Sequence, residues 1–251
     1  MIKFDVAPGV HALVHGYTNC YVVEGEGGIT LVDAAYPATW RMLETCLDQL
    51  SRTAEDVRGL IITHGHFDHV GFASRAQQSG IPVWAHRADL PILQHPYRYR
   101  PERPRLLYPL THPRAVPALS AMVAAGALRV PGVTPDHELP AGPLPELPGH
   151  PEIIHTPGHT DGECVVLLPD RSAVLTGDAL VTLDPYTGRR GPRIIAPAAT
   201  HDSRQALDSL DPLTTLDADV VLTGHGAPWR HGIDAAVRAA HANGVPGLGP
   251  K

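Results

Sequence analysis

The segment THGHFDH, residues 63–69, places four potential metal ligands within six consecutive positions. Neutral imidazoles and carboxylates are the ligands that zinc takes in catalytic sites. Because side chains alternate along an extended backbone, His64 and His66 lie on one side of the chain. Asp68 and His69 are adjacent, so the chain must bend if both are to reach one ion. The segment therefore predicts two neighbouring metal positions rather than one.

Three further candidate ligands each follow a glycine directly, and each comes just after a predicted strand. His159 lies in HTPGHTDG, Asp178 in LTGDA and His225 in LTGHG. Alone, a Gly-His pair after a strand usually marks a turn, but polar side chains gathered at strand ends need partners. Together with the first cluster, these residues strongly indicate a metal site. Eleven other histidines match no motif and are interpreted as ordinary surface or core residues.

Short strands alternating with helices must position these ligands. The continuous apolar run at 59–63 is typical of a strand buried on both faces, and it leads directly into the first cluster. Apolar residues recur with helical spacing at 39–50. Further strands are predicted at 10–14, 19–24, 29–32, 81–84, 152–155, 164–168, 173–175 and 220–223, and further helices at 70–78, 202–210 and 233–240.

Two features describe the organisation of the chain. Residues 95–117 are rich in proline and arginine and show little periodicity, which indicates an insertion that is either a lid or a surface loop without function. A proline- and glycine-rich stretch at 184–197 also interrupts the second half. Residues 1–251 are predicted to form a single domain, in which two sheets pack face to face with helices outside.

The elements HGHFDH, TPGHTDG, TGDA and TGHG occur in the order found in the metallo-β-lactamase superfamily, which the sequence resembles from about residue 10 to residue 225. The resemblance implies an α+β fold, the αββα sandwich, with the site at one edge between the sheets. It also implies two Zn²⁺ ions per chain, with iron or manganese as alternatives. The implied ligands are His64, His66 and His159 for the first metal, Asp68, His69 and His225 for the second, and Asp178 bridging both.

This arrangement implies a metallo-hydrolase. Two neighbouring metals share a hydroxide and polarise a carbonyl, because metal binding lowers the pKa of water from about 15.7 toward ~7. The bridging hydroxide would cleave an ester, thioester, lactone or amide bond of a small-molecule substrate. Asp68, beside this nucleophile, is the expected catalytic proton shuttle as well as a ligand.

Three alternatives remain open: an iron-dependent sulfur (persulfide) dioxygenase of the same fold, a member with β-lactamase activity, and a binding protein without catalysis. Persulfide dioxygenases and glyoxalase II enzymes carry a Gly-Cys-Gly-Arg segment soon after the bridging aspartate. This chain has DPYTGRRG at 184–191 and lacks that cysteine, which disfavours glutathione substrates. Tyr186, Arg189, Arg190 and Arg193 either contact a substrate carboxylate or oxyanion, or belong to a solvated loop.

Composition excludes other classes of function. The formal net charge is −6 with no block of like charge, which argues against nucleic-acid binding. The three cysteines are widely spaced, so neither a disulfide framework nor a thiolate zinc site is expected. No stretch reaches the ~18 consecutive apolar residues of a membrane helix, and the N-terminus lacks the apolar run of a signal peptide. We therefore expect a cytoplasmic protein with no membrane partner.

Overall fold

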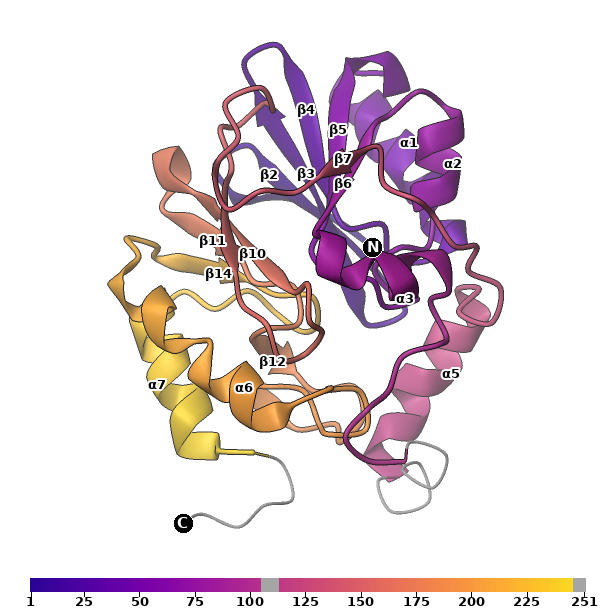
Figure 1. Ribbon diagram of the computed structural model, residues 1–251. Coiled ribbons are helices and arrows are strands. Elements are labelled where there is room, and N and C mark those ends of the chain that lie inside the picture. The colour runs from indigo at the N-terminus through magenta and orange to yellow at the C-terminus, as the bar shows by residue number, and fades with distance from the viewer. Residues whose placement is uncertain (105–112, 246–251) are drawn as a thin grey trace.

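The computed structural model describes residues 1–104 and 113–245, which contain two β-sheets packed face to face with helices on the outside (Figure 1). The first sheet is built from the N-terminal half of the chain, and its strands follow the order of the sequence. They are β1 (Ile2–Ala7), β2 (Val10–His15), β3 (Thr18–Gly25), β4 (Gly28–Val32), β5 (Val57–Ile62), β6 (Val83–Ala85) and β7 (His137–Glu138).

The second sheet comes from the C-terminal half and has the order β14-β11-β10-β9-β8, in which β14 is Val220–Leu222, β11 is Ala173–Leu175, β10 is Cys164–Leu168, β9 is Glu152–His155 and β8 is Gly142–Pro143. A separate two-stranded ribbon pairs β12 (Val181–Leu183) with β13 (Arg190–Arg193). The α-helices are α1 (Trp40–Gln49), α2 (Ala73–Gln78), α3 (Leu90–Gln94), α5 (Val116–Ala124), α6 (Ser203–Asp208) and α7 (Ile233–Asn243).

Three apolar layers hold this arrangement together. Strand β5 shows how one strand serves two of them, because Leu60 and Ile62 pack toward α1 and α2 while Ile61 packs between the sheets. Strand β10 does the same on the other side, where Val166 faces the first sheet and Val165 faces α6 and α7. Continuous apolar runs arise because each of these strands is covered on both faces. The expected αββα sandwich is therefore confirmed, with α1 and α2 outside one sheet and α6 and α7 outside the other (Figure 1).

Parallel pairing brings the ends of the site-bearing strands to one edge. Strand β5 pairs in parallel with β4 and β6, and β11 pairs in parallel with β14. The side chain of Asn19 ties the two sheets together there, since its amide donates to the backbone oxygens of Thr223 and Gly226. The hydroxyl of Tyr21 donates to the same Thr223 oxygen at 2.7 Å. These buried hydrogen bonds fix how the two halves meet at the edge.

Several element boundaries differ from the sequence predictions. The helix predicted at 70–78 begins only at Ala73, because residues 66–72 form turns closed by backbone hydrogen bonds. Strand β1 was not predicted, although apolar and polar residues alternate along it as far as Val6. Strand β13 lies within the proline- and glycine-rich stretch, where no strand was predicted. The predicted insertion at 95–117 falls partly on residues 105–112, which lie outside the described residues, and its end forms the start of α5.

Among the described residues, no helix combines the length and apolar character needed to cross a membrane.

The fold predicts a large cost for shortening Leu60, which is fully buried at the centre of β5. Leu60→Ala should lower the free energy of unfolding by about 2–5 kcal/mol, because it removes apolar contacts and leaves a cavity. Leu128→Ala is the matched control, since that leucine is 70% exposed and its loss should change stability by less than about 0.5 kcal/mol. Urea unfolding of both variants measures this, and equal effects would contradict the layer arrangement.

Candidate metal centre

The candidate ligands sit on loops that directly follow four strands. His64, His66, Asp68 and His69 follow β5, while the other three follow β9, β11 and β14. The loop after β5 bends sharply, since the backbone N–H groups of residues 69 and 70 both donate to the carbonyl of His66. This bend is the one that the adjacency of Asp68 and His69 predicts.

Two of the glycines that precede candidate ligands are required by close contacts. A Cβ at Gly224 would lie 2.3 Å from Oδ1 of Asp178, so a side chain before His225 would displace that carboxylate. Gly177 has φ of +48° and its Cβ would lie 2.5 Å from Oε1 of Glu163. A glycine thus recurs before these ligands because the loops cross one another at very short range.

The carboxylate of Asp178 lies among imidazoles from four histidines. Its oxygens are 3.3 Å from Nε2 of His225 and 3.4 Å from Nε2 of His69. They are also 3.5 Å from Nε2 of His159 and 3.9 Å from Nε2 of His64. All five side chains are buried. This is the central position that the resemblance implies for a bridging carboxylate.

The two remaining candidates join the same cluster. Nδ1 of His66 lies 3.0 Å from Nε2 of His159, and Oδ2 of Asp68 lies 3.4 Å from Nε2 of His225. The structure therefore brings all seven predicted side chains together. Three sets of donor atoms each lie within 4.8 Å of one another: His64 with His66 and His159, Asp68 with His69 and His225, and His64 with His69 and Asp178. The first two sets are the groupings that the resemblance implies for the two metals.

Polar contacts on the far side of the imidazoles set their orientation. Nδ1 of His69 lies 2.8 Å from Oδ2 of Asp33, and Nδ1 of His64 lies 3.2 Å from Oε2 of Glu163. Metal-binding histidines usually place their second ring nitrogen against such a partner, which selects the tautomer and holds the ring. Asp33 in turn accepts hydrogen bonds from the backbone and hydroxyl of Thr63.

The other two oriented histidines use neutral partners. Nδ1 of His159 lies 3.2 Å from the hydroxyl of Thr200, and Nδ1 of His225 donates to the backbone oxygen of Tyr17 at 2.8 Å. In both cases Nε2 remains directed toward Asp178. Four of the five imidazoles therefore present Nε2 to the cluster, whereas His66 presents Nδ1.

Burial keeps three of the imidazoles uncharged. Burial and the neighbouring His69 hold the pKa of His64 well below its ordinary range, and burial with His159 does the same to the pKa of His66. Burial also lowers the pKa of His159 to about 4, although Asp178 acts in the opposite direction. These rings are neutral at pH 7, the form in which imidazole binds a metal.

Carboxylates reverse the effect of burial at the other two ligand histidines. Burial disfavours a charge there, but Asp178 and Asp33 raise the pKa of His69 well above its ordinary range. Asp178 and Asp68 likewise raise the pKa of His225 to about 10. Without a metal, protons on these two rings balance the buried carboxylates, and a divalent cation would replace them.

The donor atoms fit bound cations. Nε2 of His64, Nε2 of His69 and Oδ1 of Asp178 are buried and have no hydrogen-bond partner. A buried polar atom without a partner is costly, and a native structure normally supplies one. Because these three atoms face the same small volume, metal coordination is the partner that satisfies them together.

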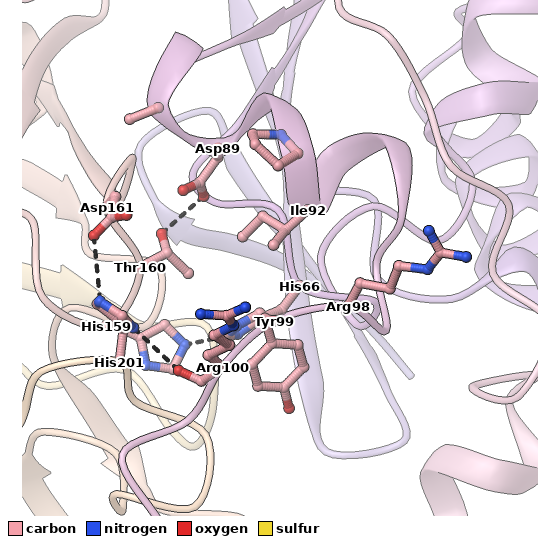
Figure 2. A pocket seen from close by; sticks show the side chains of 12 residues that line it. His66, Asp89, Ile92, Arg98, Tyr99, Arg100, His159, Thr160, Asp161 and His201 are labelled. Carbon is pink, nitrogen blue, oxygen red and sulfur yellow. Dashed lines mark hydrogen bonds and ion pairs between the residues drawn. The ribbon is translucent and has the colours of Figure 1, made fainter.

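Asp89, just before α3, links the two loops that carry the first set of ligands. Its Oδ2 accepts from the backbone of Gly65 at 2.8 Å and from the hydroxyl of Thr160 at 2.7 Å. Its Oδ1 accepts from the backbone of Gly162 at 2.7 Å. Figure 2 shows Asp89 facing Thr160 beside the cavity. The loops bearing His66 and His159 are thus cross-linked through one carboxylate.

Asp33, Glu163 and Asp89 were not predicted as site residues. Asp33 follows the apolar strand β4 in the same way that the predicted ligands follow their strands, so the same signal was present in the sequence. Glu163 directly precedes the apolar strand β10, where a buried carboxylate needs a partner. Asp89 carries no comparable local signal, because its partners are 24 to 73 residues away along the chain.

The polar residues considered after Asp178 do not line the cavity beside the first set of ligands. Arg189 and Arg190 are exposed. Arg193 is buried, and its guanidinium donates to the backbone oxygens of Gly191 and Arg190. Arg193 therefore stabilises its own loop.

Comparison with models of protein families identifies the family of this chain. The model of the metallo-beta-lactamase superfamily matches residues 13–225. The chain belongs to the metallo-β-lactamase superfamily. The match extends from β2 to the last candidate ligand, so it covers every element that positions the site.

Individual relatives of this superfamily member include enzymes. A probable metallo-hydrolase of Bacillus subtilis, YflN, is 27% identical over 240 residues, which span 90% of this chain and 86% of that protein. An N-acyl homoserine lactonase of a Bacillus species is 25% identical, with 85% and 82% covered. The hydroxyacylglutathione hydrolase GloC of Haemophilus influenzae is 24% identical, with 83% and 85% covered. The chain is accordingly a metallo-hydrolase of this superfamily.

Solved structures agree with the fold. A metallo-beta-lactamase family protein from Thermus thermophilus superposes with a TM-score of 0.65 at 25% identity, covering 94% of this chain and 80% of that one. The protein TTHA1623, solved in a di-iron-bound form, superposes with a TM-score of 0.63 at 24% identity, covering 89% and 93%.

The cross-link through Asp89 generates a prediction about metal affinity. Asp89→Ala should weaken binding of one of two metals by about 10- to 100-fold, because loss of a supporting contact lets the ligand loops separate. Asp136→Ala is the control, since Asp136 accepts hydrogen bonds from Val83 and Gln77 far from the cluster. Competition with a chromogenic chelator measures both affinities. Two tightly bound metals in Asp89→Ala would contradict the positioning role.

The lowered pKa of His159 predicts how the metal-free protein responds to acid. Its pKa falls from 6.5 to about 4 on burial, so the unfolded chain binds this proton more readily than the folded one. The free energy of unfolding should therefore fall as the pH drops from about 6.5 to 4. Thermal unfolding across this range should show a shallower dependence in His159→Gln, and an unchanged slope would contradict the assignment.

Proposed function

We propose that this protein is a dinuclear zinc hydrolase that cleaves an ester, thioester, lactone or amide bond in a small molecule. One observation carries the proposal: seven buried donor side chains from two sheets, Asp178 among them, lie in one cluster, and three of their atoms lack any hydrogen-bond partner. The first zinc would be held by His64, His66 and His159, and the second by Asp68, His69 and His225, with Asp178 shared between them.

Two zinc ions at these positions would supply a hydroxide nucleophile near pH 7 and would polarise the carbonyl oxygen of the substrate. The protein's own residues prepare this chemistry. Asp33 and Glu163 hold the rings of His69 and His64, and Asp89 keeps the two ligand loops together. The carboxylate of Asp68 would accept the proton of the attacking water and return it to the leaving group.

The relatives support carbonyl substrates, since their names describe a lactonase and a hydroxyacylglutathione hydrolase. Zinc fits a donor set of imidazoles and carboxylates. Iron fits it too, and one structural neighbour was solved in a di-iron-bound form, so metal identity is part of the test.

A hydrolysis panel tests the proposal directly. Zinc-loaded protein is assayed with lactones, thioesters, aryl esters and β-lactams, and the metal content of protein purified without added metal is measured in parallel. Turnover of at least one carbonyl class at about two zinc ions per chain is expected. Bound iron together with oxygen uptake on thiol substrates would contradict the hydrolase and favour a sulfur dioxygenase.

The role of Asp68 gives a sharper prediction. Asp68→Asn keeps the size of the side chain but removes its charge and basic oxygen, so turnover should fall by about 10²-fold or more. The melting temperature should change little, because the site lies at the edge of the sandwich. Asp170→Asn, an exposed site away from the cluster, is the control. Wild-type turnover of Asp68→Asn with both metals bound would show that Asp68 takes no part in catalysis.

A further inference from the structure

A cavity of about 200 Å³ opens beside the first set of ligands, and part of the predicted insertion forms its wall (Figure 2). His66 and His159 line it on the metal side. Arg98, Tyr99 and Arg100 line it from the insertion. The ring of Tyr99 lies 4.1 Å from the ring of His66, centroid to centroid. The insertion therefore reaches the position where a substrate would sit against the ligands.

Hydrogen bonds hold this part of the insertion in place. The side chain of His201 contacts the backbone oxygen of Arg100 at 3.1 Å, and the backbone N–H of His201 donates to the carbonyl of His159. The backbone N–H of Glu102 donates to Thr200, the residue whose hydroxyl contacts the ring of His159. Arg100 is thus attached to the loop that orients a proposed ligand, and its position relative to the centre is set.

The cavity wall carries positive charge that the surrounding protein does not neutralise. Among residues 1–104 and 113–245, neither Arg98 nor Arg100 forms an ion pair. Neither acidic residue of the wall pairs with these arginines: Asp161 lies 3.9 Å from His201, and Asp89 accepts three hydrogen bonds from the loops it joins. The charge at the wall is therefore available to a ligand.

The two arginines differ in direction. In Figure 2 the side chain of Arg98 extends away from Asp161 and His201, and its guanidinium is well separated from that of Arg100. Arg100 is the one tied through its backbone to His201. The guanidinium groups of the two arginines therefore do not form one binding site. Arg100 is the residue placed to contact a substrate.

We propose that Arg100 is a specificity-determining residue that binds a carboxylate carried by the substrate. This rests on the proposed function, because it names the substrate class of the same site: an ester, thioester, lactone or amide with a second, anionic end. The planar guanidinium matches a carboxylate through two parallel hydrogen bonds. The cavity is smaller than the ~300–1,000 Å³ typical of drug-sized ligands, which suits a short acidic chain.

A pair of esters that match in chain length and differ in charge tests the proposal. Zinc-loaded protein is assayed with mono-4-nitrophenyl adipate, which ends in a carboxylate, and with 4-nitrophenyl hexanoate, which does not. Arg100→Ala should raise KM for the adipate about tenfold or more with little change in kcat, because a charge-assisted contact is lost. KM for the hexanoate should stay within about twofold. Equal effects on both esters, or on neither, would overturn the proposal.

Variants of two neighbouring arginines test whether the change in KM is specific to Arg100. Arg103→Ala removes the same charge from the same segment but not from the cavity wall, so it should leave both esters unchanged. Arg98→Ala should change KM for the adipate less than Arg100→Ala does. The reverse order would assign the carboxylate to Arg98 and overturn the role of Arg100. Melting temperatures of all variants should match the wild type, since these side chains are exposed.

A binding measurement separates this inference from the proposed function. The ether analogue 6-(4-nitrophenoxy)hexanoate has no bond to hydrolyse, and the alcohol 6-(4-nitrophenoxy)hexan-1-ol is its neutral, equally stable counterpart. Calorimetry should show the acid binding the wild type about tenfold or more tightly than it binds Arg100→Ala, with no such difference for the alcohol. If no substrate of the hydrolysis panel is turned over but this pattern is found, the proposed function fails and the anion site stands. If the acid binds both proteins equally, the anion site fails.

Discussion

The buried carboxylate of Asp178, surrounded by imidazole nitrogens from four histidines, is the interaction on which the rest of this structure depends. Buried charges are costly unless they are paired and hydrogen-bonded. Each ring must therefore be held at a defined angle, and partners such as Asp33 and Glu163 do so from outside the cluster. The loops can cross so closely only because residues such as Gly224 lack a side chain.

The cluster also joins the two halves of the sandwich. Three of its histidines follow β5 in the first sheet, while His159, Asp178 and His225 come from the second. Asn19 and Tyr21 bond across the same seam, so the geometry of the site depends on how the sheets pack. Part of the cavity wall comes from a different source, the insertion after α3. The candidate ligands thus come from strand ends, whereas part of the cavity beside them is formed by a separate segment.

Much of this protein was predictable from local patterns. Continuous apolar runs marked β5, β10 and β14, because a strand covered on both faces needs no polar positions. The cluster was marked by the spacing of THGHFDH and by the glycines before His159, Asp178 and His225. These signals are local, because a few adjacent residues specify both the type of ligand and a tight turn. The family and its αββα sandwich followed from the same motifs, and the comparisons confirm both.

Other features exist only in the folded chain. Asp89 acts between loops far apart in sequence, so no local pattern marks it. Sequence position drew attention to the arginines after Asp178, but Arg193 bonds to its own backbone, and Arg100 lines the cavity instead. Which of several charged residues meets a substrate is decided by how distant segments pack. By itself, the sequence determined the sandwich and which seven side chains cluster in it, through short-range patterns. The tertiary structure decided the orientation of their imidazole rings and the wall of the cavity, because those depend on long-range contacts.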